Sequence, residues 1–421
     1  MDIKGKKLLI LGANAITCEI VNAARALGVY TIVTDYNPID KAPAKLIADE
    51  YWNDSIMDYD VLLPKIKEHR VDGILTGFID IVLLPYQHLC ELSGLPCYAT
   101  KEVFETTMDK AKFKQLCRDN GVPVIPEYDL ATFDPNTIDE KNKVIIKPVD
   151  NSGSRGVILC TKAESFQECL NHALSFSEKK QVVVEKYMEL DSISASYTIQ
   201  DGAITLSTLN DRYVHRSQDG GAVTCLSLYP SKYIESYMDK MNDKVCSMYR
   251  NLGVRNGLLS IQFFVEGENY YAMEMGHRLT GGQHYMISKA ENGISPLEQL
   301  IHFAVSGKMA DFSIAKKDNP RFKNVYCHLY VLGKQAKIAR FEGLDYLKKM
   351  PELLHFSQMK MVGDTIGPDG TSAQKVVGLH LKVKNRDELN RIIREIQKEF
   401  HFYDEEGTDL TLELENYTFM L

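Results

Sequence analysis

Residues 144–157 read VIIKPVDNSGSRGV, a β-branched strand that delivers Lys147 and is followed at once by a turn-forming run with Gly153 and Gly156. A lysine on a rigid strand places a fixed positive charge beside phosphates, and successive backbone N–H groups in a glycine loop form an anion-binding nest. A plain β-hairpin with a glycine turn has a similar pattern. The stretch indicates a phosphate-covering loop. Other segments of the sequence are needed to distinguish such a loop from a plain hairpin.

A second hydrophobic strand follows at residues 182–190, which read VVVEKYMEL. It runs into Glu185, Lys186, Tyr187 and Met188, where the end of a strand can offer backbone N–H and C=O groups to the edge of an adenine ring. Taken alone, the segment is more simply interpreted as a strand capped by a charged turn. The segment indicates a nucleotide site only because it lies between the first stretch and a third one.

The third stretch is residues 257–279, GLLSIQFFVEGENYYAMEMGHRL, in which two alternating strands flank a tight turn. This pattern predicts a β-hairpin. Ser260 and Gln262 share a face of the first strand, Glu274 lies on the returning strand, and Arg278 follows it. A carboxylate and a guanidinium projecting from one hairpin suit a Mg²⁺-nucleotide site, because hard cations prefer oxygen ligands and arginine matches phosphate geometry.

The first hundred residues alternate between strand-like and helix-like segments. Strands at residues 7–12 and 30–34 flank a helical pattern between Ile16 and Leu27, which predicts a βαβ unit on a parallel sheet. The turn GANAIT at residues 12–17 lacks the second and third glycines of a dinucleotide fingerprint, so NAD binding is not favoured. Asp35 suits either a ribose hydroxyl or the turn that follows it.

The remaining chain suggests two further domains. A helix containing Lys110 ends near Gly121, and strand-rich sequence then dominates to about Tyr271. A strand at residues 325–332 and an amphipathic helix at residues 387–400 belong to a final segment. We therefore predict an α/β chain with boundaries near residues 105 and 320.

Composition restricts the class of protein. The chain has 421 residues, with 44% hydrophobic and 25% charged residues, which is typical of a soluble globular protein of two or more domains. Its net charge of -8 comes without basic runs, which argues against a nucleic-acid surface and gives no support for a membrane surface. Nine cysteines without CxxC pairs favour free thiols in a reducing compartment, the cytoplasm.

Together and in this order, the three stretches resemble the ATP-grasp superfamily, and more closely its carboxylate-amine ligases related to carbamoyl-phosphate synthase, biotin carboxylase and glycinamide ribonucleotide synthetase. The likeness extends from TDYNPIDKAPAKLIADE through DKAKFKQLCRDNGVPV to a tail, FEGLDYLKKMPEL and GDTIGPDGTSAQKVVG, that is similar to amino-acid ligases. It implies a Rossmann-like domain at 1–105, an ATP-grasp domain at 106–320 with a lid at about 125–185, and a small α+β domain at 321–421.

The resemblance also implies roles for individual residues. Arg278 and Lys147 are the implied catalytic residues, with Arg278 steadying the transferring phosphate or the tetrahedral intermediate. Glu274 and Gln262 are the implied ligands of Mg²⁺ or Mn²⁺. The implied ATP-binding residues are Lys110, Lys147, Asn151, Ser152, Gly153, Ser154, Arg155, Gly156, Glu185, Lys186, Tyr187, Met188, Asp191 and Ser192.

The chain departs from the family pattern at two positions of the hairpin. Gln262 stands where the family usually has a second metal carboxylate, and Gly276 stands where the usual E-x-N-x-R pattern has asparagine. A neutral amide oxygen still ligates Mg²⁺ but gives up one negative charge, which weakens the site. The ribose-binding acid after the hinge is replaced by Ser192, with Asp191 adjacent.

Substrate contacts are expected from four further residues. In amino-acid ligases a stretch comparable to NDRYVHRSQDGG approaches the acceptor, which makes His215 and Arg216 candidates for binding a substrate carboxylate; His277 and His284, near Arg278, are candidates for a proton shuttle or a ligand. Polar packing or a solvated loop explains all four equally well.

The resemblance implies a ligase that uses ATP and Mg²⁺ to activate a small-molecule carboxylate as an acyl phosphate and then couples it to an amine. A homodimer is common among such folds. Two alternatives stay open: a phosphoribosylamine-glycine ligase, and a nucleotide-binding protein that has lost catalysis, as Gln262 and Gly276 suggest.

Overall fold

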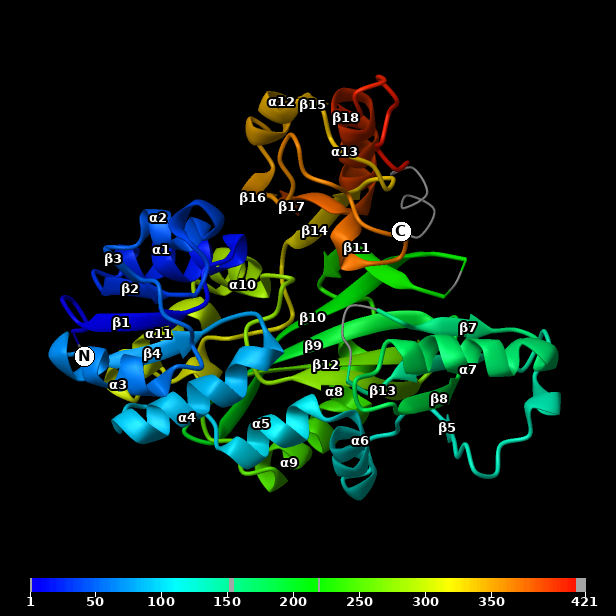
Figure 1. Cartoon of the computed structure of the whole chain (residues 1–421), viewed down its shortest axis with the longest axis horizontal. Coiled ribbons are helices and arrows are strands. Elements are labelled where there is room, and N and C mark those ends of the chain that lie inside the picture. The colour runs from blue at the N-terminus through cyan, green and yellow to red at the C-terminus, as the bar shows by residue number, and fades with distance from the viewer. Residues whose placement is uncertain (1, 151–154, 219, 414–421) are drawn as a thin grey trace.

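The computed structural model describes residues 2–150, 155–218 and 220–413, and Figure 1 shows its parts surrounding one long sheet. The amino-terminal part is a four-stranded parallel sheet with the strand order β3-β2-β1-β4. It confirms the predicted βαβ unit. Its elements are β1 (Lys7–Leu11), α1 (Cys18–Ala26), β2 (Tyr30–Thr34), α2 (Pro43–Ile47), β3 (Glu50–Trp52), α3 (Tyr59–Glu68), β4 (Gly73–Thr76) and α4 (Leu83–Ser93).

The long sheet has eight strands in the order β13-β12-β9-β10-β11-β14-β17-β16 and is antiparallel throughout. It contains the predicted hairpin, whose turn places Glu266 opposite Asn269. Its strands are β9 (Asp191–Gln200), β10 (Ala203–Arg216), β11 (Ala222–Tyr229), β12 (Gly257–Glu266), β13 (Asn269–Gly276), β14 (Val325–Leu332), β16 (Leu353–Gln358) and β17 (Lys375–Val383).

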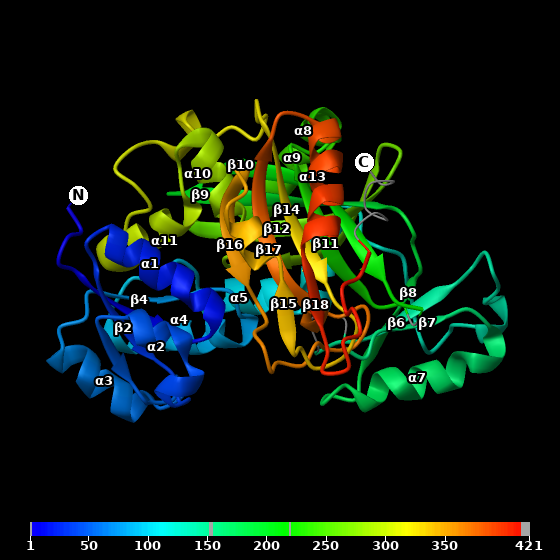
Figure 2. The same ribbon diagram turned by 90° about the horizontal axis from the view of Figure 1, so that it is seen from above.

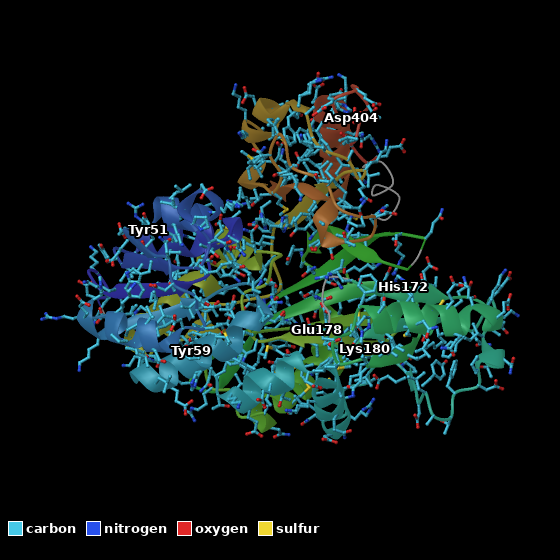
Figure 3. All side chains as sticks on the ribbon, viewed as in Figure 1. Tyr51, Tyr59, His172, Glu178, Lys180 and Asp404 are labelled. Carbon is cyan, nitrogen blue, oxygen red and sulfur yellow. The ribbon has the colours of Figure 1, made fainter. Side chains whose placement is uncertain are left out.

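A second four-stranded sheet forms a separate layer at the right of Figure 1. Its order is β5-β8-β6-β7, and one helix covers it with a small apolar core between them. This helix carries His172, which Figure 3 labels together with Glu178 and Lys180 on the following turn. The elements are β5 (Glu127–Tyr128), β6 (Val144–Pro148), β7 (Ile158–Cys160), α7 (Phe166–Ser175) and β8 (Val182–Lys186).

Two short helices, α5 (Lys101–Met108) and α6 (Lys110–Asp119), connect the amino-terminal part to the rest. The expected boundary near residue 105 falls inside α5. Phe104 packs in the core of the parallel sheet, whereas Val103 packs in the core beneath the long sheet. The predicted helix that contains Lys110 is confirmed as α6, and Asp109, whose side chain accepts hydrogen bonds from the first amides of α6, separates it from α5.

Helices α8 (Ile234–Lys240) and α9 (Asn242–Asn251) pack on the core beneath the long sheet. Helices α10 (His284–Asn292) and α11 (Pro296–Ser306) return instead to the amino-terminal sheet. There α11 approaches β4 so closely that a Cβ atom at Gly73 would overlap the carbonyl oxygen of Ala304. Residues on both sides of the expected first boundary therefore share one core.

The carboxy-terminal segment completes the far end of the long sheet, and Figure 2 shows α13 lying across that end. The predicted amphipathic helix is confirmed as α13 (Arg386–Glu399), which buries Leu389, Ile392, Ile393 and Ile396 against the sheet. The remaining elements are β15 (Arg340–Glu342), α12 (Leu344–Lys348) and β18 (His401–Tyr403), with β15 paired to β18.

All nine cysteines are free thiols, and seven of them are buried. In the described part of the chain, no helix combines the length and apolar character needed to cross a membrane.

Candidate functional site

Two adjoining cavities lie on one face of the long sheet. The smaller cavity, about 310 Å³, lies between that sheet and the β5-β8-β6-β7 layer. The larger cavity, about 830 Å³, lies between the long sheet and the loop that follows β4. Six residues line both cavities: Arg212, Thr224, Gln262, Glu274, Ser372 and Lys375.

The carboxylate of Glu185 occupies the wall of the smaller cavity between two lysines. Lys147 Nζ lies 2.5 Å from Glu185 Oε2, and Lys114 donates to Glu185 Oε1 and, at 2.5 Å, to Glu127. Burial alone would raise the pKa of Glu185, but the two ammonium groups outweigh it and lower that pKa to about 2. The side chain of Glu185 thus fixes Lys147, a role that the adenine-hinge prediction did not include.

Lys110 reaches the same cavity from the first turn of α6. Its ammonium group donates a hydrogen bond to Pro148 O at 2.9 Å. Burial lowers the pKa of Lys110, and the positive charge of Lys147 lowers it further. The structure therefore brings together two of the lysines expected to contact phosphates.

The predicted phosphate-covering loop is only partly within the described residues. Asn151, Ser152, Gly153 and Ser154 lie outside them. Arg155 is exposed and does not line either cavity, whereas Val157 lines the smaller one. Gly156 has φ +73° and lies against the ring of Phe176, so both its backbone conformation and its surroundings require glycine.

The segment predicted as the adenine hinge follows β8 along the smaller cavity, which Lys186, Tyr187 and Met188 line. The backbone N–H of Lys186 donates a hydrogen bond to Pro126 O, and that of Tyr187 donates to Lys143 O. Of their backbone groups, these two residues therefore have only the carbonyl oxygens to offer a purine. Ser192 also lines this cavity.

Asp191, the other candidate for binding the ribose, contacts two side chains outside the cavities. Lys232 Nζ lies 2.6 Å from its carboxylate, and the hydroxyl of Tyr233 donates to it at 2.5 Å. It lines neither cavity. Of the two candidates, the structure therefore places only Ser192 where a nucleotide could contact it.

Gln262 and Glu274 are directly opposite each other on β12 and β13, and both line both cavities. No cluster of three or more His, Cys, Asp or Glu side chains suited to a metal occurs within residues 2–150, 155–218 and 220–413. One carboxylate with a neighbouring amide oxygen fits Mg²⁺, which takes one or two protein ligands and completes its shell with phosphate oxygens and water.

Arg278 lines the larger cavity and is held by the amino-terminal part of the chain. Its Nε and Nη2 atoms each donate to Asp80 at 2.6 Å, which is the bidentate arrangement that fits a guanidinium best. Burial would lower the pKa of Arg278, but the hydrogen bonds and charge of Asp80 raise it. Arg278 is thus a permanent cation in a fixed orientation.

The four substrate candidates are not brought together. His284 lines the larger cavity, where its Nδ1 atom is 3.0 Å from Thr280 Oγ1 and burial lowers its pKa to about 4. Arg216 lines the smaller cavity instead, and His215 lies 2.7 Å from Asp369 outside both.

His277 corrects the expectation of a substrate contact. It is fully buried between the rings of Tyr98 and Phe104 and lines neither cavity. Burial lowers its pKa to about 3, so it is a neutral core residue at ordinary pH. Its neighbour in sequence, Arg278, lines the larger cavity.

Several cavity residues were missed because no sequence pattern marks them. Lys114 and Asp80 act through partners 71 and 198 positions away. Arg212 lies on β10 and donates to Thr224 at 2.9 Å, and Lys375 begins β17, with its ammonium group 3.6 Å from the centre of the Tyr330 ring. Burial and the positive charge of Arg212 lower the pKa of Lys375 to about 7.

Comparison with known proteins agrees with this geometry. Residues 109–309 match the family described as carbamoyl-phosphate synthase L chain, ATP binding domain. The formate-dependent phosphoribosylglycinamide formyltransferase of Prochlorococcus marinus (strain NATL1A) is 25% identical over 297 residues, covering 66% of this chain and 71% of that protein.

Two solved structures have the same fold over nearly the whole chain. The L-amino acid ligase from Bacillus licheniformis superposes with a TM-score of 0.79 at 17% identity, covering 96% of this chain and 99% of that one. The phosphoribosylglycinamide synthetase from Anaerococcus prevotii gives a TM-score of 0.73 at 18% identity, covering 95% and 99%. Residues 109–309 therefore match an ATP-binding domain of the carbamoyl-phosphate synthase L chain type, and nearly the whole chain has the fold of these two solved structures.

Proposed function

We propose that this chain is a ligase that uses ATP and Mg²⁺ to convert a carboxylate into an acyl phosphate and then joins it to an amine. Among the solved structures with this fold are an L-amino acid ligase and a phosphoribosylglycinamide synthetase. The observation that carries the proposal is the shared wall of the two cavities, because Glu274, Gln262, Arg212 and Lys375 face both. A nucleotide in the smaller cavity and a carboxylate in the larger one would meet at that wall.

The smaller cavity suits the nucleotide. Lys147 and Lys110 supply positive charge for the phosphates, and Met188 and its neighbours supply a backbone edge for the base. Glu274 and Gln262 would hold Mg²⁺, which supplies charge neutralisation for the phosphate oxygens when bound.

The reaction is balanced in two displacement steps. A carboxylate oxygen attacks the γ-phosphorus, which forms the acyl phosphate and breaks the bond to ADP. The amine nitrogen then attacks the acyl carbon, phosphate leaves, and the proton of the amine passes to solvent. Arg212, Arg278 and Lys375 are placed to offset negative charge in both steps, so catalysis rests on positioning and preorganised charge.

The test is ADP release from ATP and Mg²⁺ with pairs of carboxylates and amines. The panel contains amino-acid pairs, formate with phosphoribosylglycinamide because of the similar formyltransferase, and glycine with phosphoribosylamine for the alternative ligase. We expect one pair to stimulate ADP release and Lys147→Ala to abolish it, with the exposed Ser247→Ala as the matched control. ATP binding without stimulation by any pair would favour the non-catalytic alternative.

A further inference from the structure

The larger cavity has a floor of neutral polar side chains, which we call the polar floor. It is built by the long sheet on the side of the shared wall away from the smaller cavity. The polar floor consists of Ser194, Ser196, Asn210, Ser227, Ser260 and Gln262.

The strand register makes these side chains near neighbours. Ser194 on β9 is opposite both Asn210 on β10 and Gln262 on β12. Ser196 is opposite Ser260 in the next row on the same face. Adjacent strands are about 4.8 Å apart and alternate residues about 6.8 Å, so the polar groups form a grid of roughly 5 by 7 Å.

Three serines of the polar floor have little exposure as residues, and their hydroxyl groups open onto the cavity. Ser196, Ser227 and Ser260 are 3%, 7% and 9% exposed. None of their hydroxyl groups makes a hydrogen bond to another residue within the described ranges, although each lines the cavity. A hydroxyl group that opens onto a cavity and has no protein partner is free to bond to a ligand or to water that a ligand displaces.

Gly276 adds room above this floor. It is paired with Ser260, and a Cβ atom at Gly276 would lie 3.8 Å from Ser260 Oγ with no other heavy atom within 4 Å. The asparagine that the family usually has at this position would occupy that space. With glycine in place of that asparagine, Ser260 is open to the cavity.

Charge is concentrated at one end of the larger cavity. Arg212 and Lys375 stand at the shared wall together with Glu274, the implied Mg²⁺ ligand, and no ion pair joins either cation to another described residue. Asp80 and Arg278 neutralise each other, and Asp150 accepts hydrogen bonds from Ser177 Oγ and Lys179 N. A ligand that fits has an anionic end at the shared wall and an uncharged body that forms many hydrogen bonds.

Aromatic side chains complete the fit. Phe78, Tyr229 and Tyr330 also line the larger cavity. Apolar ring faces combined with a grid of hydroxyl groups suit a carbon chain or ring that carries a hydroxyl group on successive carbons, because its C–H faces and its O–H groups point in different directions.

We propose that the carboxylate substrate is a polyhydroxylated acid of the sugar-acid class, with its hydroxyl groups on the polar floor and its carboxylate between Arg212 and Lys375. This inference rests on the proposed ligase function and names its substrate class. The bonds formed and broken are those of the two steps above.

The first measurement is ADP release with D-glucuronate, D-galacturonate and D-gluconate against hexanoate, formate and L-amino acids, each with ammonia, glycine or L-alanine as the amine. A site built to hydrogen-bond a substrate hydroxyl rejects analogues without it by about 10⁴-fold in kcat/KM. We expect discrimination of that order between the best sugar acid and hexanoate.

The second measurement assigns the discrimination to the polar floor. Ser196→Ala and Ser227→Ala should each raise KM for the sugar acid by about tenfold, the effect of one lost hydrogen bond. They should leave ATP affinity unchanged, because neither residue lines the smaller cavity. Each variant should also discriminate less between the sugar acid and its deoxy analogues, which a merely destabilised protein would not do; Ser247→Ala is the control.

Binding separates failure of this inference from failure of the proposed function. If formate, aliphatic acids or amino acids drive ADP release and sugar acids do not, the substrate class is wrong while the ligase function stands. If no pair drives ADP release, titration calorimetry of D-glucuronate in the presence of a non-hydrolysable ATP analogue decides. Binding that Ser196→Ala weakens would support the polar floor as a sugar-acid site, and no binding would overturn it.

Discussion

The carboxylate of Glu185 sits between the ammonium groups of Lys114 and Lys147 at the back of the smaller cavity. A buried carboxylate with two cationic partners holds both lysines in place, and removing it leaves two uncompensated charges. The position of Lys147 relative to a nucleotide thus depends on a residue that would never touch the phosphates.

We predict that Glu185→Gln lowers the free energy of unfolding by about 3 kcal/mol at pH 7. The pKa of Glu185 is lowered to about 2 in the folded protein, from an ordinary value of 4.5. Its stabilisation is therefore complete above pH 4.5 and is lost as pH falls towards 2. Urea titrations of both proteins should give a difference that shrinks below pH 4.5. If the difference in unfolding free energy between the two proteins did not change with pH, the charge of Glu185 would not be the source of the stabilisation.

The sequence located Lys147, Glu274 and Arg278 because each lies in a local pattern of strand, turn and charge. It could not locate Lys114 or Asp80, whose partners are 71 and 198 positions away, because nothing local reports a contact at that distance. The opposite error occurred at His277, which follows Glu274 closely but faces the core. Adjacency in sequence does not fix the side to which a side chain points once a strand has ended.

At the scale of elements, β14 and β17 hold the turn that follows Arg278. His328 on β14 and His380 on β17 stack with their centroids 3.7 Å apart, and both donate to Gly282 O, at 3.0 and 3.3 Å. Burial, together with the charge of nearby His355, lowers the pKa of His380 to about 3 although the hydrogen bond to Gly282 raises it. Both rings must be neutral for this packing.

We predict that the amides of β14 and β17 lose protection from hydrogen exchange as pH falls from 7.5 to 5, and less so in His380→Gln. A histidine whose pKa is lowered on folding stabilises the protein above its unfolded pKa of about 6.5 and loses that contribution below it. The loss for one histidine is about 2 kcal/mol at pH 5. Equal pH dependence in both proteins, after correction for intrinsic exchange, would show that His380 is not responsible.

A second element-scale prediction concerns the contact between β4 and α11. Gly73→Ala should lower the melting temperature, with a cost of about 1 to 3 kcal/mol, because the added methyl group overlaps Ala304 O. Gly281→Ala is the matched control for stability, since a Cβ atom there meets nothing within 4 Å. Equal melting temperatures for the two variants would mean that α11 moves away at little cost.

The strands and helices were largely predictable because their apolar periodicity is strong, as at β14 and α13. The division into domains was less predictable. Helix α11 packs on the amino-terminal sheet, and β14 joins the same sheet as the predicted hairpin. The boundaries near residues 105 and 320 stay a proposal, since periodicity specifies an element but not the sheet on which it packs.

At the scale of the whole molecule, the larger cavity is assembled from distant parts of the chain. Asp80 comes from the loop after β4, Arg278 follows β13, and Lys375 begins β17. The pair of Asp80 and Arg278 fixes the orientation of the amino-terminal part relative to the hairpin.

We predict that Asp80→Asn lowers kcat for carboxylate-dependent ADP release by about 100-fold, because an incorrectly placed guanidinium loses most of its effect. The Kd for ATP should stay unchanged, since Asp80 does not line the smaller cavity. The exposed Asp58→Asn is the control. A change in KM for the carboxylate alone, with kcat preserved, would instead assign Arg278 to ground-state binding.

The position of Lys375 in the chain also has a consequence for synthesis on the ribosome. Apart from Ser372, every other residue that lines the two cavities lies at Tyr330 or earlier, and β17 is inserted between β14 and β16 rather than added at an edge. Domains generally fold as they emerge, the amino-terminal ones first. A nascent chain therefore acquires its nucleotide-facing lysines early and the last two residues of the shared wall, Ser372 and Lys375, late. A chain released before residue 372 therefore carries the lysines of the smaller cavity but lacks Lys375 at the shared wall.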